Sequence, residues 1–232
     1  MSKSALLLLA VILAAPPVAA KEAAFVTPEQ SHATSILPDW PADGSAEQQA
    51  ELAVLHAIEA SRSRPEEEAA RADAEDKSIF LFRRVFGEGF ARQNLPLTAA
   101  LGEKIDRDSE VNAGVAKNAF HRIHPYTFDT TLHPACKSNG EPESYPSGHA
   151  MRGWLLGLTL VEIVPEKRQE ILLRAEDYGH NRLICGVHYP SDVAASRSLA
   201  YAIHALETQN PDYINQLAAA RAELRNFLNM AE

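Results

Sequence analysis

Residues 149–165, HAMRGWLLGLTLVEIVP, carry the clearest fold signal in the sequence. Apolar side chains recur there at the spacing of one buried helix face: Trp154, Leu155, Leu158 and Val161. Pro165 stops the pattern, because proline has no N–H with which to continue a helix. We therefore expect a buried helix that begins at His149.

Helical patterns also cover most of the chain on either side. They run from Ser45 through Leu52, Leu55 and Ile58, from Pro96 to about Phe120 through Leu101, Ile105, Val111 and Val115, around Ile171 and Ala175, over Val193 to Leu206, and from Asn210-Pro211 to Phe227. Residues 62–77 are rich in Glu and Ala, and we expect a solvated helical face without a functional role. Because no alternating β-pattern appears, the sequence predicts a single all-α domain over residues 45–232. Residues 21–44, rich in breakers, form an extended arm.

Charge excludes one large class of function. The chain has 232 residues, with 22 Lys and Arg against 31 Asp and Glu, for a formal net charge of −9. Such a chain has no global positive field with which to gather DNA, RNA or an anionic membrane. Nucleic acid is therefore not an expected partner.

The first 20 residues, MSKSALLLLAVILAAPPVAA, predict a cleaved secretory signal peptide. One basic residue precedes eleven apolar ones, and small residues stand where a signal peptidase cuts. A membrane anchor is the alternative, but the apolar run falls short of the roughly 20 residues that span a bilayer. We expect a periplasmic or secreted protein with no membrane span after cleavage.

Two cysteines, Cys136 and Cys185, are too few for a disulfide scaffold or a four-cysteine metal site. Export favours a bridge between them, since an oxidising compartment lets a thiol pair close. The bridge would close a loop of 50 residues. By the chain-entropy model it would contribute about 4 kcal/mol to stability. Two buried thiols are the alternative.

Ser147, Gly148 and His149 stand together at the expected start of the helix quoted above. Unpaired backbone N–H groups, a hydroxyl and the positive end of the helix dipole form an anion site there. His149 would lie against such an anion. The alternative is that Ser147 only caps the helix and that His149 is a surface residue.

A second polar stretch, NRLICGVHYPSD, covers residues 181–192. Arg182 can bind phosphate oxygens with its planar fork. His188 and Asp192 are four residues apart, so they share a face if the helix extends back to His188. The carboxylate would then hold one ring nitrogen and aim the other as a nucleophile. Taken alone, the two are equally a structural pair or metal ligands.

A third stretch places Lys117 seven residues before His124 and Pro125. Lysine is a compact positive charge that suits a phosphate oxygen.

These three stretches, in this order, resemble the three-part signature of the type 2 phosphatidic acid phosphatase superfamily. The matching residues are Lys117 and Pro125 in the first part, Pro-Ser-Gly-His149 in the second, and Arg182, His188 and Asp192 in the third. It resembles in particular the secreted bacterial class A non-specific acid phosphatases. The segments Leu37–Ser45 and Ala74–Asp76 look like that family as well, so the likeness covers nearly the whole mature chain.

The resemblance implies a helical, metal-independent phosphomonoester hydrolase that uses no cofactor. His188 would attack phosphorus and become a phosphohistidine, and Asp192 would orient it. His149 would protonate the leaving oxygen and later deprotonate water. Lys117, Ser147, Gly148 and Arg182 would hold the phosphate oxygens. Its partners would be small-molecule phosphomonoesters and inorganic phosphate, and a neutral histidine beside a protonated one favours mildly acidic pH.

Two positions depart from the family pattern. His124 stands where the family has an arginine, and Asn181 where it has a serine. His124 adds positive charge only when protonated, so we keep it as a candidate phosphate contact. Asn181 still offers hydrogen-bond donors.

Three alternatives remain. A degenerate relative would bind phosphate without turnover, and a vanadium haloperoxidase would hold vanadate in the same pocket. A metallohydrolase is disfavoured, since no His-Glu-x-x-His motif is present and no metal site is expected. The sequence leaves open the preferred alcohol, transfer to alcohols instead of water, and assembly into a homo-oligomer.

Overall fold

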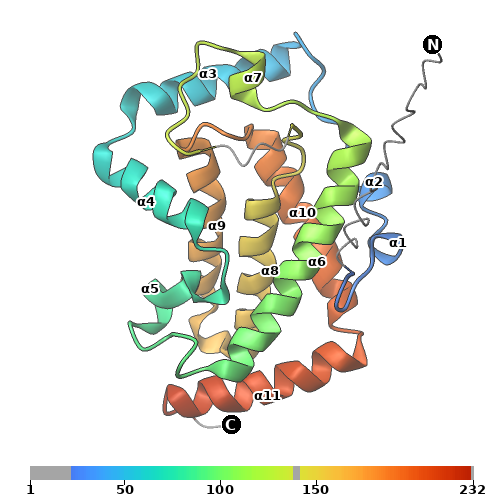
Figure 1. Cartoon of the computed structure of the whole chain (residues 1–232), viewed down its shortest axis with the longest axis vertical. Coiled ribbons are helices and arrows are strands. Elements are labelled where there is room, and N and C mark those ends of the chain that lie inside the picture. The colour runs from blue at the N-terminus through green and yellow to red at the C-terminus, as the bar shows by residue number, and fades with distance from the viewer. Residues whose placement is uncertain (1–21, 138–141, 231–232) are drawn as a thin grey trace, which may run out of the picture.

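The computed structural model describes residues 22–137 and 142–230 (Figure 1). Within these ranges every regular element is a helix, and one isolated bridge pairs Ile123 with Glu143. In chain order the elements are α1 (Pro28–Ser31), α2 (Ala33–Ile36), α3 (Ala46–Ser61), α4 (Arg64–Glu75), η1 (Ile79–Phe82), α5 (Arg83–Phe86), α6 (Pro96–Phe120), α7 (Pro125–Phe128), α8 (Gly148–Ile163), η2 (Pro165–Lys167), α9 (Arg168–Ile184), α10 (Pro190–Glu207) and α11 (Pro211–Phe227). The prediction of a single all-α domain is confirmed.

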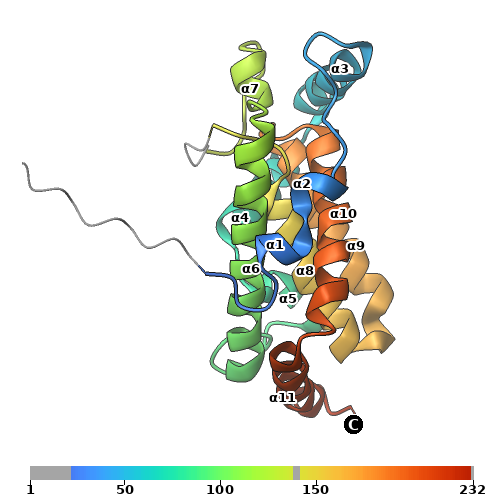
Figure 2. The same cartoon turned by 90° about the vertical axis from the view of Figure 1, so that its right-hand side faces the viewer.

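Helix α8 forms the centre of the molecule, as its sequence predicts. Thirteen of its 16 residues are buried, and it packs against α6, α9 and α10 (Figure 1). Two glycines let α9 approach closely: a Cβ at Gly153 would lie 2.6 Å from the Tyr178 ring, and one at Gly157 would lie 3.2 Å from the Ala175 Cβ. Figure 2 shows α3 and α7 at one end of this bundle and α11 crossing the other.

The helix boundaries follow the local capping chemistry. Helix α8 begins at Gly148, and the Ser147 hydroxyl accepts a hydrogen bond from the backbone N–H of Ala150. Pro165 begins the short helix η2. Asn210 caps α11 by accepting from the backbone N–H groups of Asp212 and Tyr213.

The arm over residues 21–44 differs from the extended segment that we expected, since it contains α1 and α2. Thr27 opens α1 with a capping box, a local interaction that offsets the cost of one helical turn. Asp108 on α6 anchors the arm, because its carboxylate accepts hydrogen bonds from the backbone N–H groups of Phe25 and Val26 at 2.9 Å each. The predicted signal peptide, residues 1–20, lies outside the described residues.

The expectation that residues 62–77 form a solvated helical face is wrong for one charged residue, Asp73. Asp73 is 5% exposed and forms a buried ion pair with Arg174 at 2.6 Å. Lys77 follows α4 and lines a cavity described below. The charge pattern of α4 concealed the burial of Asp73, because one helix turn can face the core while its neighbours face water.

A disulfide joins Cys136 to Cys185, with the two Cα atoms 5.0 Å apart. The prediction of this bridge is confirmed. Among the described residues, no helix combines the length and apolar character that crossing a bilayer requires.

Candidate active site

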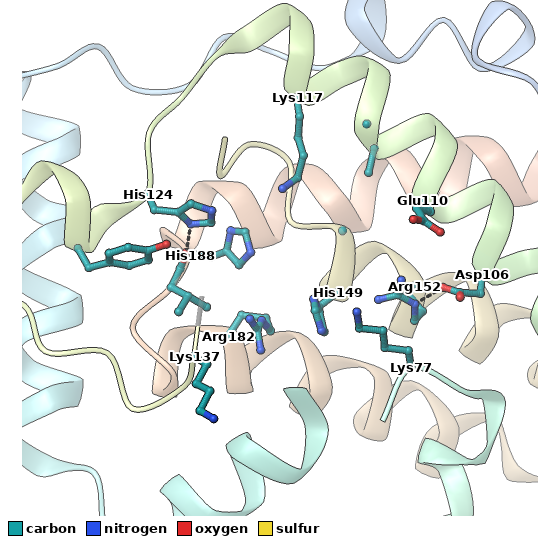
Figure 3. Close-up of a pocket in the computed structure, with 15 residues that line it drawn as sticks. Lys77, Asp106, Glu110, Lys117, His124, Lys137, His149, Arg152, Arg182 and His188 are labelled. Atoms are coloured by element: carbon teal, nitrogen blue, oxygen red, sulfur yellow. Dashed lines mark hydrogen bonds and ion pairs between the residues drawn. The ribbon is translucent and has the colours of Figure 1, made fainter. Parts of the chain in front are cut away.

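A cavity of about 250 Å³ lies where the N-terminal end of α8 meets α6 and the C-terminal end of α9. Six of the eight predicted site residues line it: Lys117, His124, Gly148, His149, Arg182 and His188. Figure 3 shows the His188 and His149 rings in the space between Lys117 and Arg182. Ser147 and Asp192 are not among the lining residues and support the wall from behind.

Arg182, in the last turn of α9, is the cation at the base of the cavity. It is 5% exposed, and its Nη1 donates to the Cys185 Sγ at 3.6 Å. Its Nε has no hydrogen-bond partner among the described residues, and none of them forms an ion pair with it. Burial lowers the pKa of Arg182 to about 10, which keeps it protonated in acidic and neutral solution. Because a buried charge is costly without a partner, this environment favours an anionic ligand.

The N-terminus of α8 forms a second wall. A Cβ at Gly148 would meet only the Ala113 Cβ, at 3.9 Å. A side chain there would therefore project toward the cavity without a clash against the described residues, and glycine keeps that space open. The first N–H groups of a helix have no partner within the helix, so an anion can accept from them. The Ser147 hydroxyl is engaged as the cap of α8.

Lys117 closes the cavity on the side of α6. It lies in the last turn of that helix, and its Nζ donates to the Glu143 carbonyl oxygen at 2.7 Å. This hydrogen bond fixes the side chain over the cavity, where Figure 3 shows it opposite Arg182.

His188 and Asp192 form a hydrogen-bonded pair, but not on one face of a helix. Helix α10 begins only at Pro190, so the condition for a shared helix face, a helix that extends back to His188, is not met. Instead, the Asp192 Oδ2 accepts from the Tyr189 backbone N–H at 2.9 Å and lies 3.3 Å from the His188 Nδ1. The carboxylate thus caps its own helix while it accepts the Nδ1 hydrogen. His188 is left with a lone pair on Nε2, the atom that a nucleophile needs.

Arg122 stands behind this pair, and sequence analysis did not single it out. It is 1% exposed, and its guanidinium contacts the Asp192 Oδ1 at 2.6 Å and the Glu51 Oε2 at 2.7 Å. The guanidinium also lies 3.6 Å from the centroid of the Tyr189 ring. Burial raises the pKa of Asp192, and the Arg122 charge opposes that rise. A charge two residues before His124 was the only signal in the sequence.

Within residues 22–137 and 142–230, one hydrogen bond holds the His149 ring. Its Nε2 lies 3.1 Å from the Ala74 carbonyl oxygen at the end of α4. Because a carbonyl only accepts, Nε2 carries a hydrogen, and Nδ1 is the atom that can exchange a proton with a ligand.

Burial lowers the pKa values of His149 and His188 well below the ordinary value of a histidine, and the nearby Arg182 charge lowers each of them further. A neutral His188 is the form that can attack phosphorus. For His149 the protonated form is required, and a phosphate dianion beside it would raise its pKa again, since an opposite charge favours the charged form.

His124 lies beside the pair. Its ring centroid is 5.2 Å from that of His188 and 5.2 Å from that of Tyr126, on which it stacks. Its Nδ1 donates to the Val187 carbonyl oxygen at 2.5 Å. Burial lowers the pKa of His124, so it is neutral at pH 7. Asn181 is turned away from this cluster and donates to the Asp73 Oδ2 at 2.7 Å.

The cavity also contains charged residues that sequence analysis missed. Lys77, Lys137 and Arg152 add positive charge, while Asp106 and Glu110 add negative charge. The sequence could have indicated Arg152, since it follows His149 by about one helical turn and so lies on the same helix face. Among the described residues, no group of three or more His, Cys, Asp or Glu side chains is placed to hold a metal ion.

Fold and site together define a helical protein whose central cavity offers two histidines and fixed positive charges to an oxyanion. The PAP2 superfamily model matches residues 99–216, just over half of the chain. The chain therefore belongs to the PAP2 superfamily, as its three motifs predicted.

Three curated relatives are named acid phosphatases. The chain is 34% identical over 149 residues to a non-specific acid phosphatase of Providencia stuartii, covering 61% of this chain and 59% of the relative. It is 34% identical over 135 residues to an acid phosphatase of Zymomonas mobilis, covering 56% and 50%. A non-specific acid phosphatase of Salmonella typhimurium is 36% identical over 120 residues, covering 50% and 47%. The chain thus spans between about half and three-fifths of these relatives.

Two solved structures share the fold at low identity. A transmembrane PAP2-type phosphatidylglycerolphosphate phosphatase from Bacillus subtilis gives a TM-score of 0.52 at 21% identity, covering 78% of this chain and 93% of that one. A bacterial vanadium-dependent iodoperoxidase gives 0.57 at 16% identity, covering 79% and 53%.

Proposed function

We propose that this protein is an exported acid phosphatase that hydrolyses phosphomonoesters through a phosphohistidine at His188, without a metal ion. The observation that carries the proposal is the buried Arg182 guanidinium, whose Nε lacks a partner among the described residues in a cavity that two histidines share. A tetrahedral dianion bound there would accept from Arg182, Lys117 and the N-terminus of α8. The acid phosphatase names of the relatives support the same chemistry.

The reaction has two steps. The His188 Nε2 attacks phosphorus, so an N–P bond forms as the bond from phosphorus to the leaving oxygen breaks, and that oxygen takes a proton from His149. In the second step, water attacks phosphorus and gives a proton to the now neutral His149. The N–P bond breaks, and phosphate leaves. Lys117 and Arg182 stabilise the charge on the phosphoryl oxygens in both steps.

The test is hydrolysis of several phosphomonoesters at pH 5 to 7 in EDTA, by the wild-type chain and by His188→Ala. We expect turnover by the wild type, none by the variant, and a trapped phosphoenzyme that is labile in acid and stable in alkali, as an N–P bond is. Undiminished hydrolysis by His188→Ala would refute the nucleophile assignment. Loss of activity in EDTA would refute metal independence. For export, the N-terminal residue of the mature protein should be Lys21.

His124 favours a second candidate, a relative that binds phosphate without turnover, because a neutral ring replaces a permanent charge next to the nucleophile. Calorimetry that detects phosphate binding, combined with no hydrolysis of a chromogenic ester, would select it. Bromide oxidation by peroxide after loading with vanadate would instead select the haloperoxidase alternative.

A further inference from the structure

The cavity extends past His149, away from His188, into a region that the reacting phosphate does not need. The residues that line this end are Lys77, Asp106, Glu110 and Arg152 (Figure 3). In the proposed reaction His149 protonates the leaving oxygen, so the leaving alcohol must lie on the His149 side of phosphorus. This end of the cavity is therefore where the rest of the substrate meets the protein.

Two of the charged side chains at this end form an ion pair with each other. Arg152 is 6% exposed, and its Nε forms an ion pair with the Asp106 Oδ1. The pair is fixed between α8 and α6, so it provides a rigid polar wall with little net charge.

Lys77 differs from this pair. It forms no hydrogen bond or ion pair with any residue that the structure describes. The backbone around it is nevertheless well anchored: the Asp76 carbonyl oxygen accepts from the Tyr178 hydroxyl at 2.9 Å, and the Asp76 Oδ1 accepts from the Ser78 backbone N–H at 3.0 Å. A fixed backbone thus holds an ammonium group at the cavity with no ion-pair partner in the described part of the chain.

The charge balance of the lining indicates what this ammonium group would bind. Five permanent cations line the cavity, against two carboxylates, in a chain whose net charge is −9. Lys117 and Arg182 account for the reacting phosphate, and Arg152 is neutralised by Asp106. Lys77 and Lys137 then remain against Glu110, so the lining as a whole keeps a net charge of +1, and a positive excess attracts anionic groups.

We propose that Lys77 forms a leaving-group subsite that selects phosphomonoesters whose alcohol carries a second anionic group, a carboxylate or another phosphate. The inference rests on the proposed phosphatase function and names the substrate class of the same site. The fixed Arg152–Asp106 pair lines the subsite, and Lys77 supplies its charge.

The experiment compares esters that differ only in this second group. The probes are 3-(phosphonooxy)propanoate, its neutral carboxamide, and ethane-1,2-diyl bisphosphate. They are assayed as kcat/KM with the wild type, Lys77→Met, Lys77→Glu, and Lys167→Met as the control. Lys167 lies in η2 and is not among the residues that line the cavity.

For the wild type we expect the carboxylate to be preferred over the carboxamide by about two- to five-fold, the range of a solvent-exposed ion pair. Lys77→Met should abolish the preference, Lys77→Glu should reverse it, and Lys167→Met should retain it. Added salt should weaken it, because the group is exposed. The bisphosphate identifies the preferred anion. Because it has two equivalent phosphate esters, its kcat/KM is halved before the comparison, and a value still above that of the carboxylate ester selects phosphate as the second group.

The inference is overturned if the wild type hydrolyses all three esters but Lys77→Met and Lys167→Met share the same carboxylate-to-carboxamide ratio. That result would leave the phosphatase function intact. If the wild type hydrolyses none of them, the proposed function itself fails, and the subsite fails with it.

Discussion

His188 and His149 share one cavity, yet the protein holds them in different ways. Behind His188 stands a chain of buried charges, Asp192, Arg122 and Glu51, in which the links from Arg122 are 2.6 and 2.7 Å long. Behind His149 there is one backbone carbonyl, that of Ala74. The difference suits the roles that we propose. A ring that forms a bond to phosphorus needs a fixed tautomer and a counter-charge, whereas a ring that only transfers a proton needs orientation and a pKa that the substrate can shift.

The Asp192→Asn variant tests the buried charges behind His188. It keeps the shape of the side chain but removes the charge that accepts the His188 Nδ1 hydrogen. We expect kcat to fall by about 10³- to 10⁴-fold, as in other enzymes whose histidine loses its carboxylate partner. Steady-state kinetics on a phosphomonoester, with circular dichroism as the folding control, would measure the loss. A fall of less than about ten-fold would mean that the pair is structural.

The His149→Asn variant tests the role of His149 as a proton donor. Loss of a general acid lowers the rate by about 10²- to 10⁴-fold when the leaving group needs a proton. An alkyl phosphate should therefore show the full loss, while 4-nitrophenyl phosphate, whose leaving group departs as an anion, should lose much less. Parallel kcat measurements on the two esters give the ratio. Equal losses on both would remove His149 from the role of proton donor.

The Arg122→Met variant tests whether the buried charges behind His188 affect chemistry. Without the Arg122 charge, the pKa of Asp192 rises further above its ordinary value, so Asp192 takes up a proton at a higher pH. The acid limb of kcat/KM should then move to higher pH, and a displacement of one unit lowers activity on that limb by about ten-fold. Arg122→Lys should largely restore the profile.

Breaking a buried pair also costs stability, by about 3–5 kcal/mol. Arg174→Met is the matched control, since Arg174 also forms a buried pair, with Asp73, and no hydrogen bond or ion pair joins it to Asp192 among the described residues. It should lose comparable stability in urea melts and leave the acid limb in place. If both variants shift the profile alike, the effect of Arg122 is only structural.

The helices and the site differ in how far the sequence predicts them. Apolar spacing and caps predicted the long helices, because α8 and α11 obey local rules that any isolated segment would show. The same spacing failed at Val115, which is 44% exposed, because the partner of a helix face is decided by tertiary packing.

Three short motifs contain the six predicted residues that line one cavity, since each motif lies at the start or the end of a long helix whose terminus borders it. What they could not predict was long-range pairing. Arg122 meets Glu51 across 71 residues of sequence, and Lys77 enters the cavity from a segment that reads as solvated. Neither contact has a local pattern, so only the fold reveals them.

The smallest expected effect concerns His124, the neighbour of His188. Burial lowers its pKa below the ordinary value, so the ring is neutral at pH 7 and gains charge only as the pH falls. His124→Arg adds a permanent cation, which at pH 7 should tighten inhibition by inorganic phosphate by about three- to ten-fold. At pH 5 the gain should be smaller, because the lower pH and the bound phosphate anion both favour the charged form of the wild-type ring. Inhibition constants at the two pH values provide the ratio. An equal gain at both would mean that His124 stays neutral throughout, and the nucleophile's side of the cavity would then rely on Lys117 and Arg182 alone.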